Sequence, residues 1–297
     1  MVDYNMKKLG IIGIGRWGKN LIREFSKISS IAKCSSNGNL QNIKWLNENY
    51  PTIKFTSSNE IFSDKKIDAI VIATPVKTHY KLVKKALFSK KHVFVEKPLA
   101  TNLTDAKELI SIAKKQNLTL FVGHVFIFDE VFKKIIQINK KEKINYLNCE
   151  WKKFGTFDDD IFLNLLSHDL SILITLLGKP RKIRLHSSFG IYTKSDVIYL
   201  ESSFKKNEKC HIHINRVSNE KKKIITIATS KNVYSWDNST LYKNKTKSDL
   251  FVPIFQARHT PLKLECKNFI QKLNKSKVNY DSANLAKDVI QVIQGLK

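Results

Sequence analysis

The chain has 297 residues, of which 42 % are hydrophobic, including 17 Phe and 9 Tyr, so it is long and apolar enough for two ordinary domains and is not a disordered chain. The formal net charge of +26 comes almost entirely from lysines spread along the chain, with few arginines for phosphate and base contacts, which indicates a basic solvated surface and no nucleic-acid partner. The four cysteines lack metal-ligand spacing, so we expect neither a metal site nor a disulfide framework. We find no apolar core of a signal peptide and no apolar run of the ~18 residues that span a membrane. We therefore expect a cytoplasmic protein without a membrane partner.

Strand and helix patterns alternate over the first 125 residues. The predicted strands are Lys8–Gly13, Ile31–Ser35, Ile67–Ala73, His92–Glu96 and Leu118–Val122, and the predicted helices are Trp17–Ser29, Ile43–Tyr50, Thr78–Ser89 and Thr104–Gln116. Ser57 and Glu60 have the spacing of a capping box and predict a further helical turn. Continuous apolar strands that alternate with helices indicate a parallel sheet covered on both faces, so we expect an α/β nucleotide-binding domain over residues 1–123.

The pattern changes after Gly123. Helices are predicted at Phe128–Ile138, Asp158–Leu177, Pro261–Leu273 and Ala283–Leu296, and alternating strands at Lys182–Phe189, Val197–Phe204, His211–Arg216 and Lys223–Thr229. Such strands are typical of an antiparallel sheet with one solvated face. The sequence therefore predicts a second, α+β domain over residues 124–297.

A glycine-rich segment separates the first strand from the first helix. It reads Gly13-Ile14-Gly15-Arg16-Trp17-Gly18, which is the G-x-G-x-x-G pattern. In this context the three glycines allow a tight turn, close approach of a pyrophosphate and packing of the helix, whose N-terminus faces the phosphates. The alternative is a purely structural glycine turn, but the position eight residues into a βαβ unit favours dinucleotide binding.

The second strand lacks the usual ribose-binding carboxylate. It ends in Cys34-Ser35-Ser36-Asn37-Gly38, and no Asp or Glu occurs between Phe25 and Asn47. A carboxylate here binds the 2′-hydroxyl of NAD and repels the 2′-phosphate of NADP. With Ser36 at the ribose position, the sequence admits NAD or NADP and favours NADP.

Two later strand ends carry further candidate residues. Thr74 and Pro75 end one strand and His79 follows in the next helix, while Glu96-Lys97-Pro98 ends another. Ligands of open α/β sheets lie at these carboxyl ends, so we expect these side chains to contact the cofactor. The ammonium of Lys97 can also hydrogen-bond a reacting oxygen. The alternatives are a capping Thr74, a packing His79 and an incidental tripeptide.

The helix predicted over Asp158–Leu177 contains Asn164 and His168, four residues apart and hence on one face. A histidine there can act as a general acid or base near neutral pH, and the alternative is a buried structural histidine. Five residues of the second domain are weaker candidates for substrate contact, namely Arg216, Lys221, Lys222, Tyr234 and Trp236.

Taken together, the motifs resemble the Gfo/Idh/MocA family of oxidoreductases over nearly the whole chain. The most specific matching stretches are Gly10–Gly18, Ile70–Leu99, Val122–Phe128, His168–Pro180 and Pro261–Phe269. The resemblance implies a Rossmann domain, a second domain with an open, mostly antiparallel sheet, and a homodimer or homotetramer assembled through that sheet. It also implies hydride transfer at a secondary alcohol of a sugar or nucleotide sugar, with Lys97 orienting the substrate and sharing the proton chemistry, and with His168 as acid and base.

The sequence departs from the family pattern at one position. Many relatives carry Asp four residues before the histidine, where this chain has Asn164, which neither holds a negative charge nor takes a proton. We therefore keep two alternatives to a sugar dehydrogenase, which are a catalytically inactive dinucleotide-binding regulator and a reductase of a non-sugar carbonyl.

Overall fold

The computed structural model describes residues 6–245, 248–275 and 278–296, and the chain divides into two compact units. The first unit combines residues 1–124 with 262–287, and the second combines residues 125–261 with 288–297. Residues 262–287 therefore belong to the first unit, although the sequence pattern placed them with the second domain.

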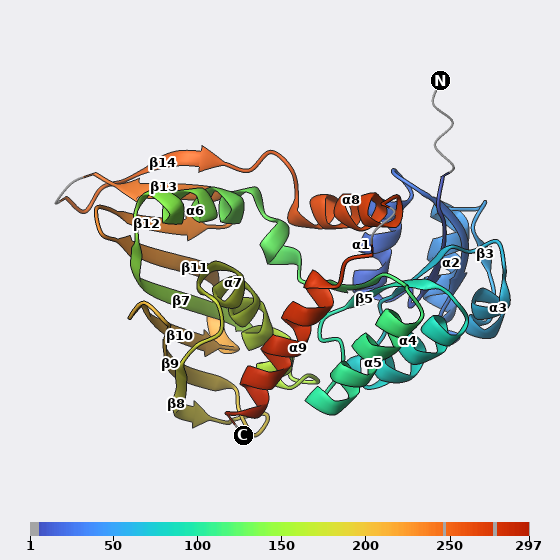
Figure 1. The fold of residues 1–297 in the computed structure, drawn as a ribbon, viewed down its shortest axis with the longest axis horizontal. Coiled ribbons are helices and arrows are strands. Elements are labelled where there is room, and N and C mark those ends of the chain that lie inside the picture. The colour runs from blue at the N-terminus through green and yellow to red at the C-terminus, as the bar shows by residue number, and fades with distance from the viewer. Residues whose placement is uncertain (1–5, 246–247, 276–277, 297) are drawn as a thin grey trace. The chain divides into compact units, whose positions relative to one another are not determined.

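The first unit is built on a six-stranded parallel sheet with the strand order β3-β2-β1-β4-β5-β6 (Figure 1). The strands are β1 (Lys8–Ile12), β2 (Ser30–Ser35), β3 (Lys54–Phe55), β4 (Ala69–Ile72), β5 (His92–Glu96) and β6 (Leu120–Gly123). This is the order of a Rossmann domain, whose ligand site lies where the strand order reverses, between β1 and β4. The predicted fold class of this half is confirmed.

Helices cover this sheet. They are α1 (Arg16–Phe25), α2 (Leu40–Asn49), α3 (Ser58–Ser63), α4 (His79–Phe88), α5 (Leu103–Lys115) and α8 (Pro261–Leu273), with a 3₁₀ turn at Val76–Thr78. Helices α4 and α5 lie side by side (Figure 1). The predicted cap is present, since the Ser57 hydroxyl accepts from the Glu60 N–H. Helix α9 (Asp281–Gln294) starts in the first unit and ends in the second.

An aromatic cluster explains why α8 packs in the first unit. Phe269 of α8 contacts Phe25 of α1, Phe94 of β5 and Phe121 of β6, with ring centroids 5.5–6.0 Å apart. All four rings are at most 1 % exposed. Burial of each such ring stabilises a core by about 2 kcal/mol or more. Helix α8 therefore forms part of the core of the first unit, although the sequence pattern placed it in the second domain.

The second unit contains an eight-stranded sheet with the order β14-β13-β12-β11-β7-β10-β9-β8. The strands are β7 (Ile144–Phe154), β8 (Lys182–Phe189), β9 (Val197–Ser203), β10 (Lys209–Asn215), β11 (Val217–Thr229), β12 (Val233–Asp237), β13 (Thr240–Asn244) and β14 (Phe251–Gln256). Strands β7 and β10 pair in parallel and the other described pairs are antiparallel. The predicted open, mostly antiparallel sheet is confirmed.

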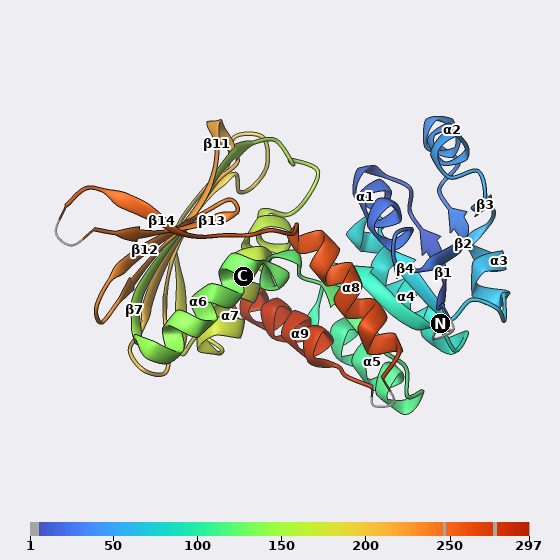
Figure 2. The same cartoon turned by 90° about the horizontal axis from the view of Figure 1, so that it is seen from above.

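One face of this sheet carries helices α6 (Glu130–Lys141) and α7 (Ser167–Leu177), while no helix of the described residues covers the other face (Figure 2). Side chains alternate accordingly. Leu200 and Ile212 are buried, whereas Tyr199 and His211 lie on the open face and remain partly exposed. The core of the second unit therefore lies between the sheet and its helices. No helix in the described ranges is long and apolar enough to cross a bilayer.

Candidate functional site

The glycine turn lies between β1 and α1, and each glycine meets a different environment. A Cβ on Gly13 would lie 2.3 Å from the carbonyl oxygen of Ala73, and the φ of Gly13 is +108°. A Cβ on Gly18 would lie 2.0 Å from the oxygen of Gly13, so this glycine lets α1 pack on the turn. A Cβ on Gly15 would meet nothing within 4 Å. Open space therefore faces Gly15 at the N-terminus of α1, where backbone N–H groups favour a phosphate.

A cavity of about 330 Å³ lies beside this turn. Six of the predicted cofactor-contacting residues line it, namely Gly13, Ile14, Gly15, Ser36, Thr74 and Pro75. Around Ser36 the wall continues with the amide side chains of Asn37, Asn39 and Asn42, and no charged residue lines the cavity in the described part of the chain. The wall of this cavity around Ser36 thus offers neutral hydrogen-bonding groups.

Trp17 and Glu96 join the glycine turn to the end of β5. The indole Nε1 of Trp17 donates to Glu96 Oε1 at 2.5 Å, and Trp17 is 39 % exposed. Arg16, the first residue of α1, is also exposed. Loss of solvent raises the pKa of Glu96 to about 7, opposed by the Trp17 hydrogen bond and the charge of Lys97. The carboxyl group of Glu96 is therefore partly protonated near neutral pH.

His79 ties the turn after β4 to the turn after β5. Its Nδ1 lies 2.7 Å from the Pro98 oxygen and its Nε2 lies 2.8 Å from the Thr74 oxygen, and the residue is 1 % exposed. Burial lowers the pKa of His79, and the two carbonyl contacts oppose this effect. Because both ring nitrogens face backbone oxygens, the structure gives His79 a bracing position, and neither nitrogen is directed to the cofactor cavity.

Lys97 follows β5 directly, at the carboxyl edge of the sheet where ligands of such folds lie. The positive charge of this side chain lowers the pKa of Glu96, His79 and His124. These three residues come from or follow β5, α4 and β6, respectively. The charge of Lys97 thus influences three ionisable groups of the first unit.

His124 and Glu265 are buried ionisable residues that sequence reasoning missed. They are 1 % and 0 % exposed, and within the described ranges neither the ring nitrogens of His124 nor the carboxyl oxygens of Glu265 have a hydrogen-bond partner. Burial and the charge of Lys97 lower the pKa of His124 to about 3. Burial and the charge of Glu96 raise the pKa of Glu265 well above its usual range. His124 is therefore neutral at pH 7, and burial favours the protonated form of Glu265. No local sequence signal distinguishes Glu265 from an ordinary helix-surface carboxylate.

Asn164 and His168 lie on the segment that leads into α7. The predicted helix from Asp158 begins later, and Phe162–Leu166 form a π turn before α7 starts at Ser167. Such turns recur at functional sites. The side-chain amide of Asn164 donates to Asp159 Oδ2 at 3.0 Å.

Two aromatic residues hold the ring of His168. It packs edge-on against Phe126 with centroids 5.0 Å apart and tilted against Trp151 at 5.5 Å. These contacts fix the plane of the imidazole, and His168 as a whole is only partly buried. The same two rings flank Lys223, whose Nζ lies 3.9 Å from the Trp151 centroid and 4.9 Å from that of Phe126.

Lys223 also pairs with Asp169, the neighbour of His168, at an N–O distance of 2.5 Å. Sequence reasoning missed this pair because its partners are 54 residues apart. Lys223 lines a cavity of about 460 Å³, together with Phe126, Trp151 and Trp236 among others. Of the five weaker candidates for substrate contact, Lys221, Lys222 and Trp236 line this cavity, whereas Tyr234 donates its hydroxyl to Glu142.

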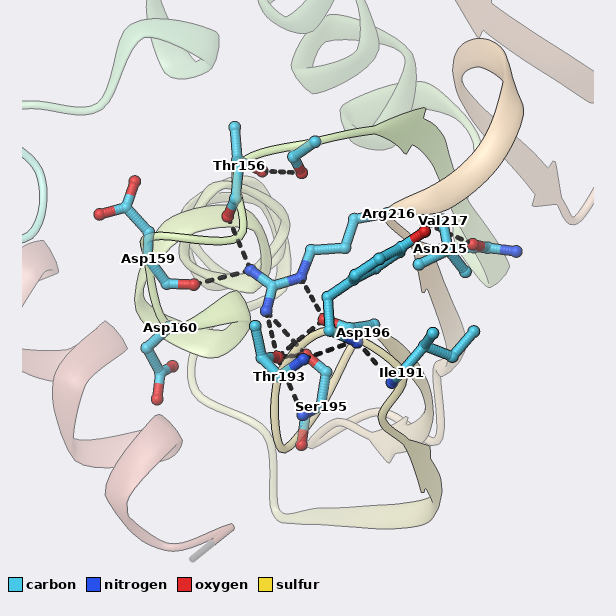
Figure 3. Close-up of polar contacts among 12 residues, drawn as sticks. Thr156, Asp159, Asp160, Ile191, Thr193, Ser195, Asp196, Asn215, Arg216 and Val217 are labelled. Carbon is cyan, nitrogen blue, oxygen red and sulfur yellow. Dashed lines mark hydrogen bonds and ion pairs between the residues drawn. The ribbon is translucent and has the colours of Figure 1, made fainter.

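Arg216, the remaining candidate, is 1 % exposed and organises two loops (Figure 3). Its Nε donates to Asp196 Oδ1 at 3.0 Å, and its Nη2 donates to the Thr193 hydroxyl and the Ser195 oxygen. Its Nη1 donates to the carbonyl oxygens of Thr156 and Asp159 at 2.8 and 2.6 Å. All five donors of the guanidinium are satisfied within the protein. Arg216 thus holds the segment that precedes Asn164.

Comparison with known proteins agrees with this geometry. The family described as "Oxidoreductase family, NAD-binding Rossmann fold" (GFO_IDH_MocA) matches residues 7–124. The uncharacterized oxidoreductase YrbE of Bacillus subtilis is 35 % identical over 137 residues, which cover 46 % of this chain and 40 % of that protein. UDP-N-acetylglucosamine 3-dehydrogenase of Acidithiobacillus ferrooxidans is 25 % identical over 194 residues, which cover 64 % and 61 %. The matches thus span less than two thirds of these relatives' length.

Solved structures extend the similarity to both units. UDP-N-acetylglucosamine 3-dehydrogenase GnnA of Acidithiobacillus ferrooxidans aligns with a TM-score of 0.88 at 21 % identity, covering 97 % of this chain and 96 % of that one. Biliverdin reductase of Synechocystis, in complex with biliverdin and NADP⁺, aligns with a TM-score of 0.81 at 17 % identity and 96 % coverage of each chain. At these identities the likeness shows the shared fold. Residues 7–124 of the chain thus match the nucleotide-binding domain of the Gfo/Idh/MocA family of oxidoreductases.

Proposed function

We propose that the protein is an NAD(P)-dependent dehydrogenase or reductase that acts on a secondary alcohol or ketone of a sugar or nucleotide sugar. The observation that carries the proposal is the open space at Gly15, at the N-terminus of α1, beside a cavity lined by the predicted cofactor residues. The name of the dehydrogenase with the same fold, which acts on UDP-N-acetylglucosamine, supports a nucleotide-sugar substrate.

We assign the chemical roles to residues of both units. A bound nicotinamide supplies or accepts the hydride. In our proposal, Lys97 hydrogen-bonds the reacting oxygen of the substrate and stabilises negative charge on it. His168, with its ring plane fixed by Phe126 and Trp151, takes or gives the proton of that oxygen. Asn164 orients the substrate through its carbonyl oxygen, since its amide group already donates to Asp159.

For the cofactor we propose contacts from the glycine turn, Ser36, Thr74 and Pro75, and a preference for NADP over NAD. Support comes from the neutral wall around Ser36, where no carboxylate of the described residues lines the cavity to repel a 2′-phosphate. The relative that binds NADP⁺ has the same fold. Fluorescence titration of the pure protein with NADPH and NADH measures the preference directly, and at least fivefold tighter NADH binding would contradict it.

We also propose that the chain forms a homodimer or homotetramer through the open face of the second sheet. That face carries a row of ring contacts that runs from Tyr146 through His211 to Tyr199 and His186. Sheet faces with partly exposed aromatic side chains are suited to burial against a second copy.

Replacement of Lys97 by Ala tests the catalytic proposal. Turnover of a UDP-sugar substrate should fall by about 10²–10⁴-fold, because the reacting oxygen loses its charged hydrogen-bond donor. The affinity for NADPH, measured by fluorescence titration, should stay within about threefold, since the cavity beside the glycine turn does not include Lys97. Unchanged turnover in the variant would remove Lys97 from the mechanism.

The same measurements separate the alternatives. A panel of UDP- and dTDP-sugars, polyols and biliverdin is assayed with NADPH and with NADP⁺. Turnover of only the non-sugar carbonyl favours the reductase alternative. Tight cofactor binding without turnover of any compound favours the inactive regulator, the alternative to which Asn164 points.

A further inference from the structure

The cavity of the second unit combines an aromatic wall with lysines of one strand. Lys223 of β11 stands opposite Trp151 of β7, and Ile225 of β11 stands opposite Trp236 of β12. Directly paired residues share one face of a sheet, and this is the face that contacts His168. The cavity is about 460 Å³ in volume, which is enough for one sugar ring with a substituent.

Lys223 lies in the wall of this cavity, where an ion pair balances its positive charge and its ammonium still has N–H groups to donate. Its side chain is 17 % exposed and pairs with Asp169, whose side chain is 1 % exposed. One of its three N–H groups serves this pair, and the ammonium lies over the faces of Trp151 and Phe126. Because Asp169 balances its charge, Lys223 suits a neutral hydroxyl or carbonyl oxygen better than a second full negative charge. Asp169 acts as a positioning residue that holds the ammonium in the wall.

Lys221 differs from Lys223 in its charge balance. It is exposed, lines the same cavity, and forms no ion pair with any described residue. Its neighbour Lys222 pairs instead with Glu150 at 3.7 Å. No carboxylate of the described residues lines the cavity. Lys221 therefore places an uncompensated positive charge at the rim.

Lys221 and Lys223 both line this cavity, so an exposed ammonium at the rim and an ion-paired ammonium in the wall face the same site. The aromatic residues of the wall suit the C–H face of a sugar ring.

From this arrangement we propose that the cavity selects sugars that carry an anionic substituent, such as a carboxylate, phosphate or diphosphate, over neutral polyols. Lys221 binds the anion, and Lys223 binds an oxygen of the ring. The inference rests on the proposed function and narrows its substrate class.

Calorimetric titration of the full chain tests the selectivity without turnover. The probes are UDP-N-acetylglucosamine, glucose 6-phosphate and glucuronate as anionic sugars, and myo-inositol and glucose as neutral compounds. We expect at least one anionic probe to bind tenfold or more tightly than either neutral compound, and its binding to weaken between about 50 and 300 mM salt. The three anionic probes separate a diphosphate, a phosphate and a carboxylate as the recognised group.

Single substitutions show which lysine is responsible for the selectivity. Lys221→Gln should weaken binding of the anionic probe at least tenfold and leave the affinity for the neutral compounds unchanged. Lys223→Gln should weaken binding of both classes of compound. Lys231→Gln, an exposed lysine in the turn between β11 and β12, removes the same charge outside the cavity and should change nothing. Lys221 is exposed, so its variant should fold even where the loss of the Asp169 partner destabilises Lys223→Gln.

The proposal is overturned when Lys221→Gln binds the anionic probes as tightly as the wild-type protein, when neutral compounds bind equally well, or when no anionic probe binds. Cofactor titration and turnover are measured separately. Anion-selective sugar binding without turnover would leave this inference standing while the dehydrogenase proposal fails, so the two failures are distinguishable.

Discussion

Glycines 13 and 15 stand two residues apart, yet an added methyl group meets a different environment at each. At Gly13 it collides with backbone and the φ of +108° is strained for any other residue, whereas at Gly15 it enters open space. The same motif therefore contains one position where the fold requires glycine and one where a side chain would meet no protein atom, as our cofactor proposal requires.

A pair of variants separates these two requirements. Gly13→Ala should lower the free energy of unfolding by about 2 kcal/mol or more, because its Cβ would lie 2.3 Å from the Ala73 oxygen. Gly15→Ala should cost less than about 1 kcal/mol and weaken NADPH binding at least tenfold, because its methyl group fills the space for a phosphate. Urea denaturation and fluorescence titration measure the two effects. Equal NADPH affinity of Gly15→Ala and wild type would place the pyrophosphate elsewhere.

At the scale of elements, Arg216 links the loop before β9 to the segment that enters α7. It connects Asp196 and Thr193 with the carbonyl oxygens of Thr156 and Asp159 (Figure 3). Five donors hold the Asp196 carboxylate, namely the N–H groups of residues 191–193, the Thr193 hydroxyl and Arg216. Burial alone would raise the pKa of Asp196, but the hydrogen bonds from residues 191–193 lower it. The pair is thus buried and fully hydrogen-bonded, which is the condition under which removing one partner is expensive.

Arg216→Lys should therefore destabilise the second unit by about 3–5 kcal/mol, because a lysine keeps the charge but cannot supply five donors in one plane. Hydrogen exchange should quicken first over residues 156–160, the segment that two of the lost hydrogen bonds hold. Arg184→Lys, at an exposed position on β8, is the matched control and should stay within about 0.5 kcal/mol of wild type. Equal stability of the two variants would show that Arg216 does not anchor the loops.

Five of the six strands of the first sheet could be predicted because each is a short apolar run bounded by turn residues, whereas the two-residue β3 was not predicted. Ala69–Ile72 and Leu120–Gly123 are buried throughout, as strands covered on both faces should be. Four strands of the second sheet were not predicted. In β7 the apolar alternation breaks between Ile144 and Leu147. Strands β12 and β13 are only five residues long, and β13 carries mostly polar residues. The edge strand β14 contains Pro253, which argues against a strand when the sheet is not known.

The candidate site, too, could be predicted from the sequence only in part. Local motifs predicted the glycine turn and the lysine after β5, because their residues are adjacent in sequence. The contact of His79 with Pro98 and the Lys223–Asp169 pair join residues 19 and 54 positions apart in the sequence, and the burial of Glu265 depends on the fold of the first unit. Their roles come from which elements the fold brings together, and local spacing does not contain that information.

At the scale of the whole molecule, the first unit is discontinuous in sequence. Its core includes Phe269 of α8, which packs with Phe25, Phe94 and Phe121. Without α8 these three rings lose their cover, and each fully buried aromatic ring contributes about 2 kcal/mol or more. A domain that is marginally stable cannot lose that contribution and remain well ordered.

A fragment of residues 1–124 should therefore lack a cooperative unfolding transition and should bind NADPH weakly. The same fragment joined to residues 262–287 through a flexible linker should recover both properties, since it restores the composition of the compact unit. Near-ultraviolet circular dichroism and NADPH titration compare the two fragments, and a Phe269→Ser version of the longer one is the control. A cooperatively folded short fragment would show that α8 is dispensable.

This discontinuity has a consequence for how the protein is made. The ribosome synthesises the amino-terminal 124 residues long before it translates α8. At about 5–20 residues per second, the delay is roughly ten to thirty seconds. During that interval the nascent first unit lacks the ring of Phe269 that covers its aromatic cluster, while residues 125–261 of the second unit are translated. Both units receive their last residues only at the end of synthesis, because residues 262–287 complete the first unit and residues 288–297 complete the second.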